Sequence, residues 1–380
     1  MEEQNLQIAE NYTVWQKFCR NRLALVGLIF IGIVTIFAIF GYLICPDEST
    51  YSNRQCLEIA AKKPGFTTTF LKVPLNKEIN NSSFLSILLY GKRQQFEYIP
   101  IKNYSVNDKY IVFQRYSEGE LIKFNDSILL NKFTIDINNP SINESISKNY
   151  IVKTKFILGT DRFGRDMLSR LIIGSRISLS VGFIAVLLSL VIGLLLGAIA
   201  GYYRGWVDSA IMWIVNVTWS VPTLLMVISI TMVLGKGFWQ VFIAVGLTMW
   251  VEVARIVRGQ VISIREKDYI EACRAMGFSS FRIITKHVIP NTLGPVIIIS
   301  AANFASAILI EAGLSFLGVG VQPPVPSWGN MIKDHYGYII LDKAYLAVLP
   351  GLAIMLLVLA FTFVGNGLRD AFDSKSVPIQ

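Results

Sequence analysis

The sequence predicts an all-α membrane protein with six transmembrane helices and an extracytoplasmic insert, α+β or partly disordered, between the first two. Hydrophobic residues make up 53% of the chain and charged residues only 16%, whereas a soluble globular protein carries about 25% charge. The mean hydropathy is accordingly positive, at +0.51. The apolar residues form blocks long enough to cross a bilayer, which takes a helix of roughly 20 residues. One long polar stretch separates the first block from the rest.

The first apolar block, Leu23 to Ile44, carries no charge. It is too long for the core of a signal peptide and no small-residue cleavage site follows it, so we expect a retained helix. The other expected spans are Ile177–Ala200, Ile211–Leu234, Phe238–Ala254, Asn291–Ala312 and Tyr345–Val364. Pro222 interrupts the third span and Gly294–Pro295 the fifth, and such breaks are tolerated where neighbouring helices cover the freed backbone groups.

Basic residues near the helix ends predict the orientation. Lys17, Arg20 and Arg22 precede the first span and Arg369 follows the last, which places both termini in the cytoplasm. The connector between spans four and five is then also cytoplasmic, and it is basic: Arg255, Arg258, Arg265, Lys267, Arg274, Arg282 and Lys286. Because the formal charge of +9 is concentrated at helix ends, it does not indicate nucleic-acid binding. Four arginines disagree with this orientation, since they precede the second span on the expected outer side: Arg162, Arg165, Arg170 and Arg176.

Residues 46–155 differ from their surroundings in being rich in Asn, Lys, Ser and Tyr. The runs "KYIVFQRY" and "ELIKF" mix strand-forming with polar residues. We expect either a small, partly β domain or a poorly ordered polar loop. Cys45 and Cys56 fall outside the membrane and could pair or stay unpaired, whereas Cys19 and Cys273 fall inside and should stay reduced.

The segment "RFGRDMLSRLIIGSR" after this stretch has apolar residues at helical spacing. It predicts an amphipathic helix in the membrane interface, with its arginines reaching lipid headgroups. The preceding "GTDRFGRD" approaches a phosphate-binding loop but lacks the Lys and Ser/Thr that hold phosphate and Mg²⁺. Gly193, Gly197 and Gly201 then form a small-residue stripe, which lets another helix approach closely, from a partner subunit or from this chain.

The connector between spans four and five, at about 255–290, is patterned as two helices. Tyr269, Ala272, Cys273 and Met276 recur at helical spacing as one apolar stripe, flanked by Glu271 and Arg274. Gly277 suits a helix-ending turn, Ser279 can cap a second helix, and Pro290 fits a first helical turn. In the second helix Phe281, Ile284 and Val288 continue an apolar face. Two interpretations remain open from the pattern: a docking surface for a cytosolic protein, or two helices lying against headgroups.

The stretch "EACRAMG", followed after nine residues by "HVIP", resembles the EAA loop of ABC-importer membrane subunits. The departures are Cys273 for an alanine, His287 for an isoleucine and Ile289 for a leucine. "WQKFCRNRLALVGL", "LGTDRFGRDMLSRLIIGSRISLSVG" and "LSFLGVGVQPPVPSWGNMI" resemble the second, C-type permease of dipeptide/oligopeptide/nickel importers. The likeness covers residues 14–44 and 157–372 and leaves the polar stretch outside it.

This resemblance implies the type I ABC-importer permease fold and a non-catalytic subunit that needs no cofactor. The implied partners are a second homologous permease, two ABC ATPase subunits, an extracytoplasmic solute-binding protein, a peptide substrate and membrane lipid of the bacterial inner membrane. The implied organisation is a cytoplasmic segment (1–22), a first helix (23–44), the insert (45–156), an interfacial segment (157–176), a permease core (177–367) and a cytoplasmic tail (368–380). The residues implied to couple to the ATPase are Tyr269, Glu271, Ala272, Cys273, Met276, Gly277, Phe278, His287 and Pro290.

Three residues are candidates for the translocation pathway. Glu311 is an acid inside an apolar run, which makes it a pathway candidate or an interface-level structural acid. Ser315 lies one turn further on, and Pro222 breaks the third span. The rigid stretch "QPPVPSWGN", with Trp328, could contact the binding protein or gate the outer mouth. The rival functions are a secondary transporter, which would work without ATP, and a membrane hydrolase using Ser315 with His335.

Overall fold

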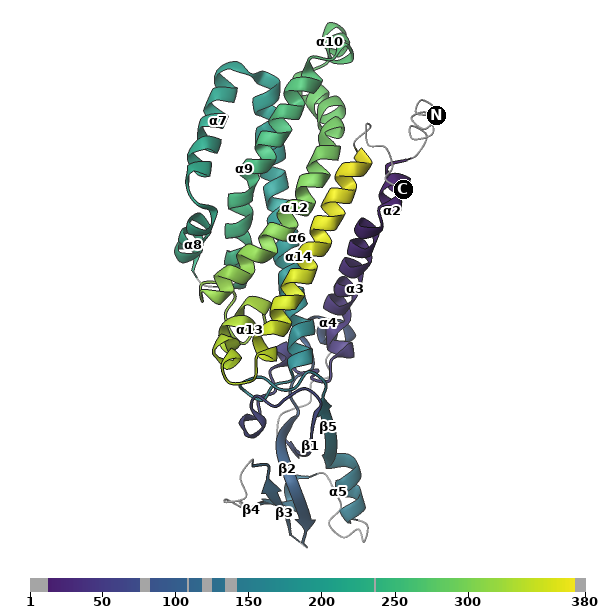
Figure 1. Ribbon diagram of the computed structural model, residues 1–380, viewed down its shortest axis with the longest axis vertical. Helices are drawn as coiled ribbons and strands as arrows, with labels where there is room; N and C mark the ends of the chain where they lie inside the picture. The colour runs from purple at the N-terminus through teal and green to yellow at the C-terminus, as the bar shows by residue number, and fades with distance from the viewer. Residues whose placement is uncertain are drawn as a thin grey trace.

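The computed structural model describes residues 13–75, 83–107, 109–117, 125–133, 142–235 and 237–372. Long helices lie side by side over most of the molecule, and a β-sheet lies beyond them at one end (Figure 1). The helix α10 (Asp268–Ala275) lies at the opposite end, where α2 (Val14–Arg20) and the last turn of α14 (Tyr345–Phe372) are also found. The expected strand "ELIKF", at residues 120–124, lies outside the described residues, as do parts of both terminal segments.

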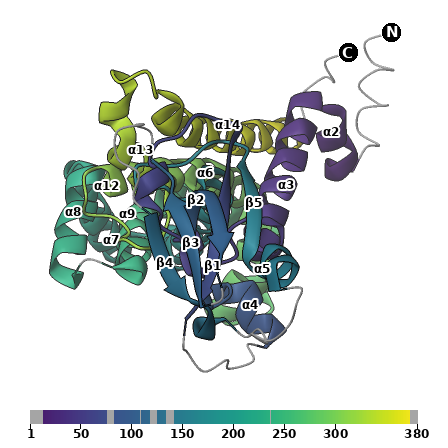
Figure 2. The same cartoon turned by 90° about the horizontal axis from the view of Figure 1, so that it is seen from below.

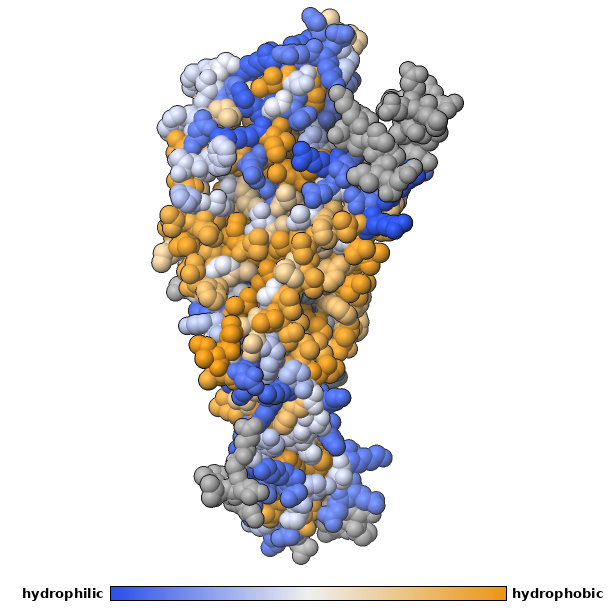
Figure 3. All heavy atoms as spheres, in the orientation of Figure 1, coloured by the Kyte–Doolittle hydropathy of each residue, from blue (hydrophilic) through white to orange (hydrophobic). Residues whose placement is uncertain are grey.

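Within the described residues, five helical stretches are long and apolar enough to cross a membrane. They are α3 (Arg22–Ile44), α6 (Met167–Tyr203), α9 (Phe238–Arg265), the stretch Ser280–Phe316 that contains α12 (Ile289–Phe316), and α14. A sixth is formed if α7 (Gly205–Ser220) and α8 (Thr223–Leu234), which meet at 93°, count as one broken span. Pro222 lies at this bend, as the sequence predicted. On the face shown in Figure 3, apolar side chains form a broad belt across the helices.

The expected break at Gly294–Pro295 is wrong. Pro295 lies inside the continuous helix α12, and a π-helical turn, Ile284–Val288, precedes it. A Cβ at Gly294 would lie 3.1 Å from the ring of Phe372 in α14. The helix therefore stays whole with α14 packed beside it, in the surroundings that make a proline tolerable in a membrane helix.

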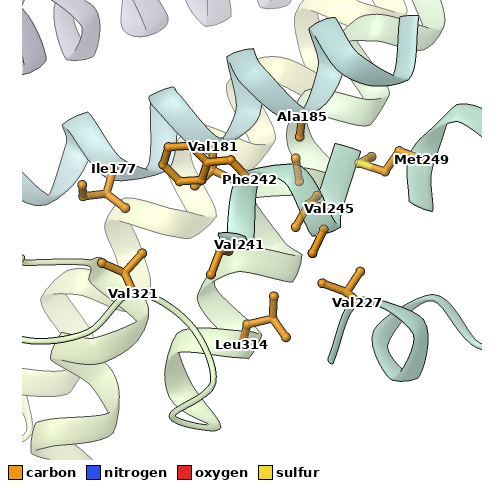
Figure 4. Packing of buried hydrophobic residues seen from close by; sticks show 12 residues of the cluster. Ile177, Val181, Ala185, Val227, Val241, Phe242, Val245, Met249, Leu314 and Val321 are labelled. Atoms are coloured by element: carbon orange, nitrogen blue, oxygen red, sulfur yellow. The ribbon is translucent and has the colours of Figure 1, made fainter. Parts of the chain in front are cut away.

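The centre of the bundle is an apolar cluster that joins four helices. Figure 4 shows side chains of α6, α8, α9 and α12 converging there. The members are Ile177, Val181, Ala185, Val227, Val241, Phe242, Ala244, Val245, Met249, Ala307, Leu314 and Val321. The cluster holds α8, the second half of the broken span, against the unbroken helices.

The glycine stripe of α6 packs against α9 of the same chain. A Cβ on Gly193 would lie 2.8 Å from the carbonyl oxygen of Trp250, and one on Gly197 would lie 2.5 Å from that of Ala254. A Cβ on Gly201 would be similarly close to the carbonyl oxygen of Arg258. The two backbones therefore approach each other as small-residue stripes allow in membranes, and the neighbour is this chain's own helix.

We expect Gly197→Ala to lower the thermal unfolding midpoint of the detergent-solubilised protein. The new methyl would meet backbone atoms that cannot yield, and overpacking of this kind costs about 1–3 kcal/mol. Gly259→Ala is the matched control, because a Cβ at this exposed site of α9 meets nothing within 4 Å. An equal loss of stability in both variants would contradict the packing.

The insert folds as a five-stranded antiparallel sheet in the order β4-β3-β2-β1-β5. The strands are β1 (Phe66–Pro74), β2 (Phe96–Val106), β3 (Tyr110–Arg115), β4 (Asn125–Leu129) and β5 (Ile151–Phe156). The predicted strand in "KYIVFQRY" is β3. Helix α5 (Ile142–Tyr150) covers one face, since Ile146 and Tyr150 pack with Leu71, Ile111 and Phe113 of the sheet. The expectation of a small, partly β domain is thus confirmed for the described part of the insert, which Figure 2 shows from below.

All four cysteines are reduced. Cys45 and Cys56 have separate partners: the Cys45 thiol lies 3.8 Å from the carbonyl oxygen of Ser169, and the Cys56 thiol 3.5 Å from that of Tyr98. Burial raises the pKa of each thiol to about 12. Because the thiolate is the reactive form, neither cysteine is primed for disulfide chemistry.

Candidate functional site: the hairpin between α9 and α12

The chain between α9 and α12 forms the helical hairpin that the sequence predicted. Helix α10 ends at Ala275, and Gly277, two residues later, has a φ of +78° that suits a residue without a side chain. The amide of Gly277 donates to the carbonyl of Arg274 (2.9 Å) and that of Phe278 to Cys273 (3.1 Å), the pair of bonds of a Schellman motif. The Ser279 hydroxyl then caps α11 (Ser280–Ile283) by accepting from the amide of Arg282.

The inner face of the hairpin is built into the helix bundle. Ile270, Cys273, Ile283 and Val288 are buried in one apolar cluster with residues of α6 and α9. Each such side chain contributes roughly 1.5–3 kcal/mol when it is removed from water. The hairpin is therefore an extension of the packed core.

The outer face carries large apolar side chains that are exposed. Tyr269 is 40% exposed, Met276 63% and Phe281 77%. The expected stripe was wrong in one member, because Cys273 is only 6% exposed and lies on the inner face. Ile270 lies three residues before Cys273 and shares its face, a spacing that the sequence analysis overlooked. Phe281 likewise does not share a face with Ile284 and Val288, which are buried.

The charged residues of the hairpin differ in the contacts that they make. Glu271 is exposed, and it has no ion-pair partner within the described part of the chain. The alternative pairing with Arg274 is not formed, since the Arg274 guanidinium lies 5.3 Å from the ring centroid of Tyr202. Arg265 lies near the same ring, at 5.8 Å. Arg265 and Arg274 therefore contact Tyr202 of α6 at the base of the hairpin, while the Glu271 carboxylate is exposed to solvent.

Three further predicted residues shape the hairpin. The Phe278 ring lies near the His287 ring (centroids 6.3 Å apart) and near the Arg282 guanidinium (4.2 Å from the Phe278 centroid). The Asn291 amide donates to the carbonyl of His287 at 2.6 Å. Pro290 is exposed in the first turn of α12. Phe278 and His287, both half-buried, thus link the turn after α10 to the π-helical turn before α12.

The pathway candidates Glu311 and Ser315 form a buried cluster at the other end of α12. Glu311 is fully buried, and its Oε1 accepts hydrogen bonds from the hydroxyls of Ser315 and Ser327, both at 2.7 Å. The Ser315 hydroxyl also accepts from the amide of Val321. These bonds tie α12 to the loop before α13 (Trp328–His335). Pro222 is exposed at the α7–α8 bend and is not part of this cluster.

The hydrolase alternative finds no support in this geometry. The Ser315 hydroxyl donates to Glu311, not to an imidazole. His335 uses both ring nitrogens on backbone groups: Nδ1 donates to the carbonyl of Met331 (2.6 Å), and Nε2 accepts from the amide of Arg162 (3.2 Å). A Ser–His catalytic pair requires a hydrogen bond from the serine hydroxyl to the imidazole, and here both groups are bonded to other partners.

The segment "GTDRFGRD" forms a buried ionic cluster that the sequence analysis missed. The Asp161 carboxylate accepts from the amides of Phe163 and Arg165 and from Nε of Arg165, at 2.6–2.9 Å. Nε of Arg170 lies 3.7 Å away from it. The expectation that these arginines reach headgroups is therefore wrong for Arg165 and Arg170, each 4% exposed. The i,i+4 spacing of Asp161 and Arg165 was the available signal.

His335 makes the link between this cluster and α13 dependent on pH. Burial lowers the pKa of His335, although Asp161 and Asp334 oppose the shift and Arg162 adds to it. Because the folded pKa lies below the unfolded value of about 6.5, the contribution to stability is present above that pH and is lost as pH falls. We expect the unfolding midpoint to drop between about pH 7 and pH 5, and to drop less in His335→Gln. Equal slopes would contradict this assignment.

No group of three or more His, Cys, Asp or Glu among the described residues could hold a metal ion.

Two family models match the chain. Residues 12–59 match the N-terminal transmembrane domain of oligopeptide transport permease C, and residues 193–377 match the inner membrane component of binding-protein-dependent transport systems. The stretch between them, which holds most of the insert, matches neither.

Curated relatives are similar over the same core. The dipeptide transport system permease of Alkalihalophilus pseudofirmus is 43% identical over 57% of this chain and 71% of its own length. The oligopeptide transport system permease of Bacillus subtilis is 40% identical over 57% and 71%, and the glutathione transport system permease of Pectobacterium atrosepticum 39% over 57% and 72%. Among solved structures, a chain of the MetNI methionine ABC transporter matches with a TM-score of 0.45 and 22% identity, covering 55% of this chain and 98% of that one.

Proposed function

The chain belongs to the family of permease subunits of peptide ABC importers, and from that premise we propose that it forms half of the pathway of an importer for dipeptides or oligopeptides. The identity of 43% to a dipeptide permease, over 71% of that protein, carries the proposal. As a member of this family the chain is a non-catalytic integral membrane subunit, with the fold of type I ABC-importer permeases and with ATP hydrolysis on a separate subunit. Its helices match the predicted fold class, six spans with the broken pair counted as one.

The partners that we propose are a second homologous permease, two ATPase subunits and a solute-binding protein on the sheet side. The end that carries α10 would be cytoplasmic, together with both termini. The support is the excess of basic residues at this end, where α2, α10 and the last turn of α14 lie together.

The hairpin would be the part of this subunit that the ATPase grips. Tyr269, Met276 and Phe281 would supply an apolar contact, and the unpaired Glu271 carboxylate a charge-assisted one. Ala272 is exposed beside them. Because Ile270 and Cys273 join the hairpin to α6 and α9, closure of the ATPases would move these helices and shift the two-state equilibrium of the pathway.

The test begins with gentle purification of the tagged protein from its own cell and mass spectrometry of what accompanies it. We expect a second permease and P-loop ATPases. The recovered complex is then placed in proteoliposomes together with its binding protein. It should take up labelled dipeptides or oligopeptides only when ATP is present on the side of the membrane that carries the ATPase subunits. Uptake that needs an ion gradient and no ATP would instead establish the secondary transporter.

A further inference from the structure

The insert contains a short helix that does not belong to its sheet. Helix α4 (Phe84–Tyr90) has the sequence FLSILLY and precedes β2. None of its residues is buried, and Phe84, Leu85, Leu89 and Tyr90 are each 59–65% exposed. A water-facing domain rarely exposes so dense a group of large apolar side chains, so such a patch marks a contact surface.

Helix α4 lies beside the transmembrane helix α3. It contacts α3, and Figure 1 places it next to the sheet-proximal end of that helix. The neighbouring surface of α3 is itself apolar and open, with Ile36, Ile39 and Phe40 each 41–53% exposed. The exposed side chains of α4 therefore continue the apolar belt of the membrane-spanning helices.

Arg176 fixes the depth of α4. Its guanidinium donates to the carbonyls of Leu88 and Leu89 in α4, at 2.7 and 3.0 Å, and to the carbonyls of Ala38 and Ile39 in α3. Ala38 lies six residues before the end of α3 at Ile44. With a rise of about 1.5 Å per residue, this point is about 9 Å inside the end of the span. The last turn of α4 is thus level with the hydrophobic part of α3.

The contacts of Arg176 provide hydrogen-bond donors for the carbonyl groups at the end of α4, which a helix end in lipid requires. The last carbonyls of a helix have no intrahelical partner, and in hydrocarbon no water can take their place. The guanidinium of Arg176 satisfies two of them, and the amide of Gly91 donates to the carbonyl of Ile87 at 2.9 Å. The expectation that Arg176 reaches headgroups is wrong, because its donors are used on these backbone carbonyls.

We propose that α4 is seated in the leaflet on the sheet side of the membrane, with lipid acyl chains covering Phe84, Leu85 and Leu89. Lys92, two residues after α4, forms an ion pair with Glu48, which follows the end of α3, so both segments reach polar surroundings there. Lipid is favoured over a protein partner because the patch is continuous with the lipid-facing belt of α3. The insert is therefore held to the bilayer by its own helix.

The test places the photo-crosslinking analogue benzoylphenylalanine at Phe84 in the full chain, assembled with its partners in native membranes. Illumination should give an adduct of the mass of a phospholipid. The same analogue at Tyr110, an exposed aromatic residue on the sheet (43% exposed), should give no lipid adduct. An adduct at Phe84 with another polypeptide, or no adduct with lipid, would overturn the proposal.

A second variant tests the role of Arg176. In Arg176→Gln the carbonyls of Leu88 and Leu89 lose the guanidinium, so the lipid adduct at Phe84 should be lost in the protein that still assembles. Arg93→Gln is the control, since its side chain is exposed beyond the helix, and it should keep the adduct. An unchanged adduct in Arg176→Gln would show that Arg176 does not hold α4 in the bilayer.

Discussion

Asp161→Ala is expected to destabilise the protein more than any other single substitution proposed for it. The carboxylate is 1% exposed and holds Arg165 by an ion pair of 2.6 Å, with Arg170 also close by. Its removal leaves two buried guanidinium groups without their main counter-charge, and breaking a buried pair in this way costs about 3–5 kcal/mol. The two amides that Asp161 accepts from, on Phe163 and Arg165, also lose their partner.

The measurement is the thermal unfolding midpoint in detergent, together with the yield of folded protein in the membrane. Lys63→Ala is the matched control: its ion pair with Asp342 has a similar distance of 3.0 Å, but the two side chains are 71% and 92% exposed. An exposed pair contributes little, so the control should melt like the wild type. If both variants behave alike, burial does not set the strength of the Asp161 cluster.

Phe281→Asp is expected to have the largest effect on transport. Its ring is 77% exposed at the tip of the hairpin, so the folded subunit loses almost nothing. In the assembled importer, an aromatic anchor at an interface carries roughly 2 kcal/mol or more, which corresponds to a loss of about 30-fold in affinity for the ATPase. The added carboxylate increases the penalty because it must be desolvated.

We expect ATP-driven peptide uptake and co-purification of the ATPase to fall together in Phe281→Asp, while its melting temperature stays unchanged. Ser263→Asp adds the same charge at an exposed polar position of α9 and should preserve both. Uptake at the wild-type rate in Phe281→Asp would remove Phe281 from the proposed docking surface. A lowered melting temperature would instead mean that Phe281 is a packing residue.

The sequence predicted the features that depend on local chemistry. Gly277 and Ser279 gave the turn of the hairpin, because a residue with positive φ and a capping hydroxyl act within one turn of the chain. Pro222 gave the break in the third span for the same reason. Apolar blocks gave the spans, since any helix that crosses a bilayer needs them whatever its neighbours are.

Features that depend on which neighbour a residue meets were harder to predict. Cys273 is compatible with either face of α10, and only its packing with Ile270 and Ile283 decides for the inner one. The arginines of residues 162–176 had the composition of an interfacial helix, but Asp161 draws Arg165 and Arg170 inward and backbone carbonyls bind Arg176. Helix α4 was missed because seven residues are too few to signal a membrane element by length.

The junction between the sheet and α6 has a mechanical consequence. The amide of Cys56 donates to the carbonyl of Phe163, that of Ala61 to Asp161, and that of Lys62 to the hydroxyl of Thr160. At Gly164 a Cβ would lie only 1.7 Å from the carbonyl oxygen of Cys56, so the two backbone segments are in direct contact. Helix α6 continues from this joint for 37 residues, about 55 Å at 1.5 Å per residue, and lies along α9 to the base of the hairpin. Sheet and hairpin are thus joined through one unbroken helix, which places the insert in mechanical series with the proposed docking surface.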